Sequence, residues 1–300
     1  MGQIPADILC HKEVPMSTRS PARSGLTGLY LSLLAYGALF GLLQLKILPA
    51  LGWSEGVVLL VCSLAASAVP LVWSRFVPAP QGPRPLFLPG AGQLVFLLSV
   101  SLTGNLVLML LTPWMEKLWK HFGLTALPAP GDERLTPLLA LYICVVGPVL
   151  EELVFRGVLL RRLSPAGARV AVVLSALCFG LMHHDLYQGL SAFWCGLVFG
   201  YAYLQYGLLF SVGVHMAGNS IAVLLQWLQG RGTAASLVIL LLAAAPVLIT
   251  LVGVLRRLRR PRTASSLPGP QPGFRWAAPA LWALLAFDTI YLILASFRRV

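Results

Sequence analysis

Long apolar segments separated by short polar ones dominate this chain. A helix that crosses a membrane needs about 20 predominantly apolar residues, and several segments approach or exceed that length. Prolines, glycines and charges lie between them, as loops between helices require. The predicted spans are 26–48, 56–73, 91–112, 135–160, 168–183, 190–205, 208–228, 233–255 and 276–297. The pattern therefore predicts an all-α fold, a polytopic membrane helix bundle.

Composition supports the same class. Of the 300 residues, 58% are hydrophobic and only 11% are charged, which is more apolar surface than a soluble domain can bury. In a soluble protein the net charge of +12 would suggest nucleic acid. Here the cations flank apolar segments, where they orient spans and meet anionic lipid headgroups. We therefore expect the lipid bilayer as surroundings and no nucleic-acid partner.

The spans divide the chain into parts with different roles. We expect a cytoplasmic N-terminal tail (1–24), a helix bundle (25–257), a basic Pro/Gly-rich linker (258–275) and a C-terminal transmembrane helix (276–300). Lysines and arginines fall on alternate loops, which predicts a cytoplasmic N-terminus. They include Arg19, Arg23, Arg75, Arg84, Arg156–Arg162 and Arg256–Arg262. Because Arg298 and Arg299 fall on the opposite side in a nine-span count, we expect eight or nine spans.

The segment after the third span has a different pattern. Trp114, Leu118 and Phe122 recur at four-residue steps with charges between them. Such a pattern is typical of a short helix in the headgroup layer, and an ordinary loop with interfacial tryptophans fits it nearly as well.

Two adjacent acids stand in the fourth span. No charge occurs from residue 135 to residue 150, and then Glu151 and Glu152 follow. Ionisable groups within membrane helices are costly and usually functional. Glu152 and Arg156 share a helix face and can form an ion pair, whereas Glu151 points about 100° away and needs a partner from another helix. Alternatively, both acids mark a helix end that arginines anchor.

Histidines in two later spans lie at similar depths. Folding the chain back after the fourth span places Glu151 opposite about Phe179, about 6 Å of helix rise short of His183. His215 lies about 12 Å into the seventh span and Glu151 about 16 Å into the fourth, and Asn219 shares a face with His215. The depths predict one shared polar site, although each histidine could be a hydrogen-bonded packing residue.

Three other polar residues are expected to have structural roles. His184 and Asp185 look like a solvated helix end, and we expect Asp288 to be a packing partner for a neighbouring polar group.

The three polar stretches together resemble a known family. Glu-Glu-x-x-x-Arg at 151–156, Phe-x-x-x-His at 179–183 and His-x-x-x-Asn at 215–219 are similar to the motifs of the CAAX-protease and bacteriocin-processing enzyme (Abi) family. The resemblance covers the motif-bearing core, 135–228, and implies an eight-helix intramembrane endopeptidase.

The resemblance also implies a role for each motif residue. Carried over by position, Glu151 is the general base and His183 its partner in holding water. His215 and Asn219 stabilise the oxyanion. Glu152, Arg156 and Phe179 are supporting residues.

Metal dependence is the main mechanistic alternative. Glu151, His183 and His215 could supply three zinc ligands and leave water in the fourth position. The sequence lacks the His-Glu-x-x-His helix that commonly builds such sites. We therefore expect a metal-free mechanism and no cofactor.

Partners follow from the resemblance. We expect a membrane-anchored or lipidated protein substrate, while its identity, the side of product release and the oligomeric state stay open. The many alanines, prolines and arginines favour a bacterial inner membrane. The alternatives are a non-catalytic scaffold or immunity protein of the same fold, and a transporter with a proton-carrying Glu151, which the lack of internal repeats disfavours.

Overall fold

A computed structural model describes residues 22–80, 90–127, 135–259 and 269–299. Most of the predicted N-terminal tail, with Arg19, lies outside the described residues. So do Arg84 and residues 260–268 in the middle of the predicted basic linker.

The described chain is almost entirely helical, so the predicted all-α bundle is confirmed. Its long helices are α1 (Ala22–Leu42), α2 (Glu55–Phe76), α3 (Ala91–His121), α7 (Ala168–Leu181), α8 (Leu186–Tyr206), α9 (Leu208–Leu228), α10 (Thr233–Leu258) and α11 (Pro279–Ser296). A π-helical segment, η1 (Leu43–Ile47), and a 3-10 turn, η2 (Pro49–Leu51), follow α1. Two short strands, β1 (Leu124–Thr125) and β2 (Arg298–Arg299), pair antiparallel.

The fourth predicted span is a composite helix. It runs through α4 (Pro137–Leu141), η3 (Tyr142–Val146), α5 (Gly147–Glu152), η4 (Leu153–Leu160), α6 (Arg161–Leu163) and the 3-10 turn η5 (Ser164–Ala166). Both η3 and η4 are π-helical, and they lie on either side of the short α5 that carries the two acids. π-helical turns are rare and frequently occur at functional sites. No pattern along the chain predicted these π-helical segments.

Seven described helices are long and apolar enough to cross a membrane, so the protein is an integral multi-pass membrane protein. Two predicted spans, 168–183 and 190–205, form helices that are not among the seven. With 14 residues, α7 reaches only about 21 Å, less than the hydrocarbon core of a bilayer. α8 is long enough, but Gln188, Ser191 and Gln205 make it less apolar.

The prediction of a separate interfacial helix after residue 112 is wrong. α3 continues through Pro113 to His121 as one helix of 31 residues. Near its end Glu116 is buried, and it accepts hydrogen bonds from Thr125 and from the backbone of Ala126. These bonds tie the end of α3 to the residues that follow it, whereas Trp114, Leu118 and Phe122 are exposed.

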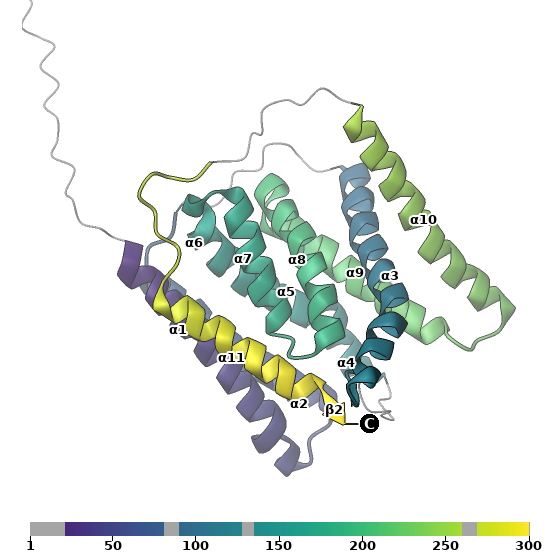
Figure 1. Cartoon of the computed structure of the whole chain (residues 1–300), viewed down its shortest axis with the longest axis horizontal. Coiled ribbons are helices and arrows are strands. Elements are labelled where there is room, and N and C mark those ends of the chain that lie inside the picture. Colours follow the sequence, from purple (N-terminus) through teal and green to yellow (C-terminus); the bar gives the residue numbers. More distant parts are fainter. Residues whose placement is uncertain (1–21, 81–89, 128–134, 260–268, 300) are drawn as a thin grey trace, which may run out of the picture.

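Helices α7 and α8 pack closely at the middle of the bundle (Figure 1). α1, α2 and α11 cover one side of this centre, and α3 with α10 lies at the opposite edge. Gly180 of α7 faces Gly189 of α8, and a Cβ atom at Gly180 would lie 2.7 Å from the Gly189 carbonyl oxygen. The missing side chains therefore let the two backbones touch, as small residues do between membrane helices.

Candidate active site

Glu152 is the buried anchor of a polar cluster. Its side chain is fully buried, and Oε1 lies 2.9 Å from Nη1 of Arg156, so the predicted i,i+4 ion pair is formed. Oε2 accepts a 2.5 Å hydrogen bond from the hydroxyl of Ser211 in α9. These partners compensate the buried charge of Glu152. Without them, an unpaired charge at this depth would be strongly destabilising.

Arg156 is buried with its acid. Its Nη2 donates to the carbonyl of Gly196 in α8 at 3.1 Å. The guanidinium carbon lies 4.7 Å from the centre of the Phe179 ring and 5.5 Å from that of Phe199, at cation–π distances. Arg156 thereby joins η4 to α7 and α8, which fixes the helix that carries the acids.

His215 connects the two acids. Its Nδ1 lies 3.1 Å from Oε1 of Glu152, and its Nε2 lies 3.5 Å from Oε2 of Glu151. The imidazole is buried and stacks on Phe199 with 4.4 Å between ring centres. A carboxylate only accepts hydrogen bonds, so Nδ1 donates to Glu152. Nε2 is left to interact with Glu151.

Glu151 is the more accessible acid. Its side chain is 23% exposed, whereas that of Glu152 is 0% exposed. Glu151 also interacts electrostatically with His183, Tyr36 and Tyr142, and the Tyr142 hydroxyl is hydrogen-bonded to Ser63 at 2.6 Å. Tyr142 belongs to the same composite helix as Glu151, whereas Tyr36 lies in α1, His183 follows α7 and His215 lies in α9.

His183 stands just past the end of α7. Its Nδ1 lies 2.8 Å from the carbonyl oxygen of Phe179, which can only accept, so Nδ1 carries the proton. The other ring nitrogen, Nε2, is then the acceptor in the neutral imidazole. That nitrogen suits the binding of a water proton.

The ring of Phe179 contacts both histidines. It meets His183 edge-on at 4.9 Å and His215 edge-on at 5.8 Å between ring centres. Phe179 is itself 2% exposed and packs against Phe155. The motif phenylalanine therefore packs against both imidazoles.

Asn219 binds the backbone of the composite helix. Its Nδ2 donates to the carbonyl oxygen of Ile143 in η3 at 2.9 Å. In η4, the carbonyl of Phe155 similarly accepts from Ser175 at 2.8 Å. Side chains of neighbouring helices therefore bind carbonyl groups of both π-helical segments, and Asn219 joins α9 to the helix that carries the acids.

The polar residues at the far end of α7 contact other helices. His184 is not a solvated helix end, because its side chain is only 10% exposed and its Nε2 lies 3.2 Å from Oδ1 of Asp288 in α11. Asp185 accepts a hydrogen bond from the backbone of Gln188 and caps α8. Asp288 was expected to have a polar partner, and His184 is that partner.

Ser211 was missed by the sequence reasoning. It lies four residues before His215, on the same face of α9, and this spacing was the available signal. A lone serine in a membrane helix usually bonds its own backbone, so the spacing alone did not distinguish it.

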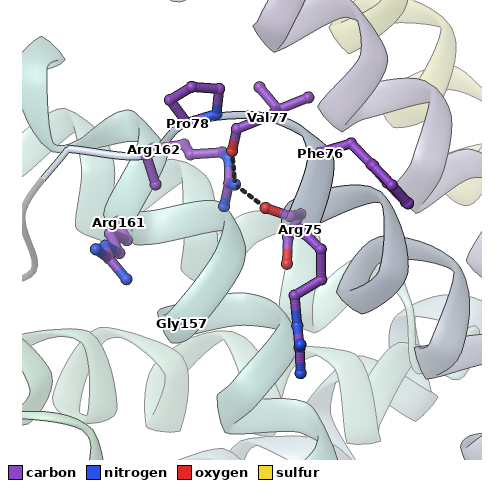
Figure 2. A pocket seen from close by; sticks show the side chains of 9 residues that line it. Arg75, Phe76, Val77, Pro78, Gly157, Arg161 and Arg162 are labelled. Atoms are coloured by element: carbon purple, nitrogen blue, oxygen red, sulfur yellow. Dashed lines mark hydrogen bonds between the residues drawn. The ribbon is translucent and has the colours of Figure 1, made fainter.

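An arginine-lined hollow lies at the other end of the composite helix (Figure 2). It has a volume of ≈ 530 Å³, and Arg75, Arg161 and Arg162 contribute to its lining. Arg162 donates to the carbonyls of Ser74 at 2.9 Å and Val77 at 2.7 Å, where α2 ends. None of the predicted catalytic residues lines this hollow. Arg161 and Arg162 hold the end of α2 and the residues after it to the composite helix, away from the acid–histidine cluster.

The zinc alternative does not fit this arrangement. Within the described ranges, no group of three or more His, Cys, Asp and Glu side chains is placed to hold one metal ion. His215 already has both ring nitrogens directed at carboxylates. The metal-free mechanism stays a prediction.

Comparisons with known proteins agree on one family. Residues 133–221 match the family model described as Type II CAAX prenyl endopeptidase Rce1-like. The chain is also similar to a membrane-embedded CAAX protease, MroQ, of Staphylococcus aureus (strain USA300), with 33% identity over 34% of this chain and 47% of that protein. The match thus spans about half the length of that relative. No solved structure matches the chain.

Proposed function

Because residues 133–221 place the chain in the CAAX-protease and bacteriocin-processing enzyme family, we propose that it is an intramembrane endopeptidase in which Glu151 and histidine activate water. The observation that carries this proposal is the position of His215 between two carboxylates, of which Glu151 is the accessible one. An accessible carboxylate beside an imidazole suits proton transfer. Glu152 is engaged by Arg156, Ser211 and His215, so it supports the site.

In the proposed reaction, Glu151 and His183 hold a water molecule against the scissile peptide bond. The water oxygen adds to the carbonyl carbon, Glu151 takes the proton that the water loses, and a tetrahedral oxyanion forms. When the carbon–nitrogen bond breaks, Glu151 gives this proton to the leaving amine. The products are a carboxylic acid and an amine, and Glu151 is again a carboxylate.

His215 and Asn219 are the proposed donors to the oxyanion. Fixed donors in a water-poor site stabilise developing charge more than they would in water. Nε2 of His215 is directed toward Glu151. Because Nδ1 already donates to Glu152, His215 would donate to the oxyanion through Nε2 with both ring nitrogens protonated. Asn219 has a second amide hydrogen besides the one bound to Ile143, and that hydrogen is the one it would supply.

The proposed substrate is a membrane-anchored or lipidated protein. The acids and histidines lie on apolar helices, so a peptide bond reaches them most easily if its chain is already held in the bilayer. We place the protein in a bacterial inner membrane with its N-terminus in the cytoplasm, as the distribution of arginines predicts.

A cleavage assay tests the proposal. Purified protein is reconstituted with a reporter that carries a C-terminal transmembrane anchor, and the rate of reporter cleavage is measured. We expect Glu151→Gln to lower the rate about 10²–10⁴-fold, the usual contribution of a general base. We expect His215→Ala to lower the cleavage rate as well, because Glu151 and Glu152 both lose their imidazole partner.

Asp185→Asn is the matched control for Glu151→Gln. It is also a carboxylate-to-amide change, but asparagine caps helices as well as aspartate does, so cleavage should continue at the wild-type rate. Cleavage by Glu151→Gln at the wild-type rate would remove Glu151 as the base. Loss of cleavage after exhaustive chelation, restored by zinc, would overturn the metal-free mechanism.

A further inference from the structure

The C-terminal helix reaches the end of α7 through a buried acid. Asp288 of α11 is 0% exposed, and its Oδ1 lies 3.2 Å from Nε2 of His184. Its other oxygen, Oδ2, is buried and has no hydrogen-bond partner among the described residues. Burying a carboxylate with one unsatisfied oxygen lowers the stability of the fold. Such residues in membrane helices usually have a functional role. A helix that needed only to pack here could have used an apolar side chain.

The backbone at His184 is strained. Its φ is 51°, and no other described residue except glycines has a positive φ. Histidine in this left-handed region is unfavourable without a compensating contact. Nε2 of the ring is bound by Asp288, and its face stacks on Tyr291 of α11 with 3.9 Å between ring centres. Contacts from α11 therefore hold the turn in a conformation that it would not prefer alone.

A third contact from α11 secures the same turn. The backbone N–H of Leu186 donates to the hydroxyl oxygen of Ser296 at 2.9 Å. The connection between α7 and α8 is thus bound at two positions, His184 and Leu186. The three α11 side chains that bind it are Asp288, Tyr291 and Ser296. This degree of restraint is unusual for a short connection between two helices.

His183 belongs to this restrained turn. Its ring packs against Phe179 on the side of the acid–histidine cluster, while the ring of the next residue, His184, packs against Tyr291. The two adjacent histidines thus contact different helices, His183 packing against α7 and His184 against α11. Because His184 is fixed, the backbone of its neighbour is fixed as well.

We infer that Asp288 and His184 are positioning residues that hold His183 in place for the reaction. This inference rests on the proposed function, since it assigns the C-terminal helix a part in the same site. It extends the site beyond residues 133–221, the part that matches the family model. The link acts through the backbone, and neither residue touches the reacting atoms.

Kinetics give the first test. The variants are Asp288→Ala, His184→Asn and the double variant, and asparagine is chosen because it tolerates a positive φ. We expect each single variant to lower kcat at least 10-fold and to leave KM within about twofold, since the substrate does not contact either residue. The double variant should be no slower than the slower single variant, because both changes break one link.

Thr289→Val is the matched control. Thr289 is the next residue of α11 and is exposed, so its replacement should leave kcat unchanged. Thermal unfolding in detergent and the elution profile establish that each variant is folded. If Asp288→Ala does not fold, His184→Asn and Asp288→Asn carry the comparison.

Nuclear magnetic resonance of ¹⁵N-labelled histidine gives a readout that does not depend on cleavage. The chain has five histidines, and a His183→Gln variant assigns the signal of His183. In the wild type we expect the Nδ1-protonated form, and in Asp288→Ala and His184→Asn a shifted or averaged signal. Thr289→Val should keep the wild-type signal.

The two readouts separate failure of the inference from failure of the proposed function. If the His183 signal and kcat are both unchanged in folded Asp288→Ala, the inference is overturned, even where thermal stability falls. If the wild type does not cleave any reporter, the proposed function fails, and the resonance of His183 still decides whether Asp288 positions it.

Discussion

Nδ1 of His215 lies 3.1 Å from Oε1 of Glu152, in a buried contact between residues 63 positions apart in the sequence. The contact joins α9 to α5 and directs the opposite ring nitrogen toward Glu151. It gives the two neighbouring acids different environments, one enclosed and one accessible. Different consequences follow for changes at each acid.

Replacement of either acid by glutamine should separate stability from activity. Glu152→Gln leaves the Arg156 guanidinium buried without a charged partner, which should lower the free energy of unfolding by about 3–5 kcal/mol. Glu151→Gln removes a partly exposed charge and should change it by less than about 1 kcal/mol, while it abolishes most cleavage. Unfolding in detergent and reporter cleavage measure the two effects. Equal losses of stability would contradict the assignment.

Ser211 should contribute measurably to stability. Its hydroxyl donates to Glu152 at 2.5 Å, and a hydrogen bond to a charged group is worth about 1.5–3 kcal/mol. We expect Ser211→Ala to lower the free energy of unfolding by that amount. The control is Ser220→Ala in the same helix, where an exposed hydroxyl bonds only the carbonyl of Met216, and a change within about 0.5 kcal/mol is expected. Equal effects at both serines would remove Ser211 from the cluster.

Phe179 should matter for both packing and chemistry. Its ring contacts His183, His215 and the guanidinium of Arg156, and it is almost fully buried. Phe179→Ala should cost about 3–5 kcal/mol of unfolding free energy, because truncation leaves a cavity. Phe179→Leu keeps most of the volume and should cost less, yet it should still slow cleavage because it lacks the aromatic ring that contacts both imidazoles. Wild-type cleavage by folded Phe179→Leu would show that volume alone suffices.

Gly180 tests the close contact of α7 with α8. A Cβ atom there would lie 2.7 Å from the carbonyl oxygen of Gly189, so Gly180→Ala should force the helices apart and cost about 1–3 kcal/mol. Gly213→Ala is the control, since apart from the adjacent backbone of its own helix no described atom lies within 4 Å of the added carbon. In a helix interior that change should be neutral or stabilising by up to about 1 kcal/mol. Thermal unfolding of both variants checks the contrast, and a stable Gly180→Ala protein would contradict it.

Parts of the site could be predicted because they depend on one helix only. The spacing of Glu152 and Arg156 places them on one face of any helix, and the structure forms their ion pair. Similarly, the angle between adjacent residues required Glu151 to face another helix. The solvated end predicted for His184 was wrong because its partner, Asp288, lies 104 positions away in the sequence. No local pattern encodes such a contact.

The sequence by itself determined the membrane location, most helix positions and which polar residues lie at a common depth, since hydrophobic length and helix rise are local properties. Only the tertiary structure decided that Glu151 faces His215, that Asn219 binds a π-helical carbonyl, and that α11 holds the turn beside His183. The physical reason is rotation about the helix axis. A helix that is apolar on all sides carries no strong amphipathic signal for its orientation, so close packing of the neighbouring helices sets which side chains meet.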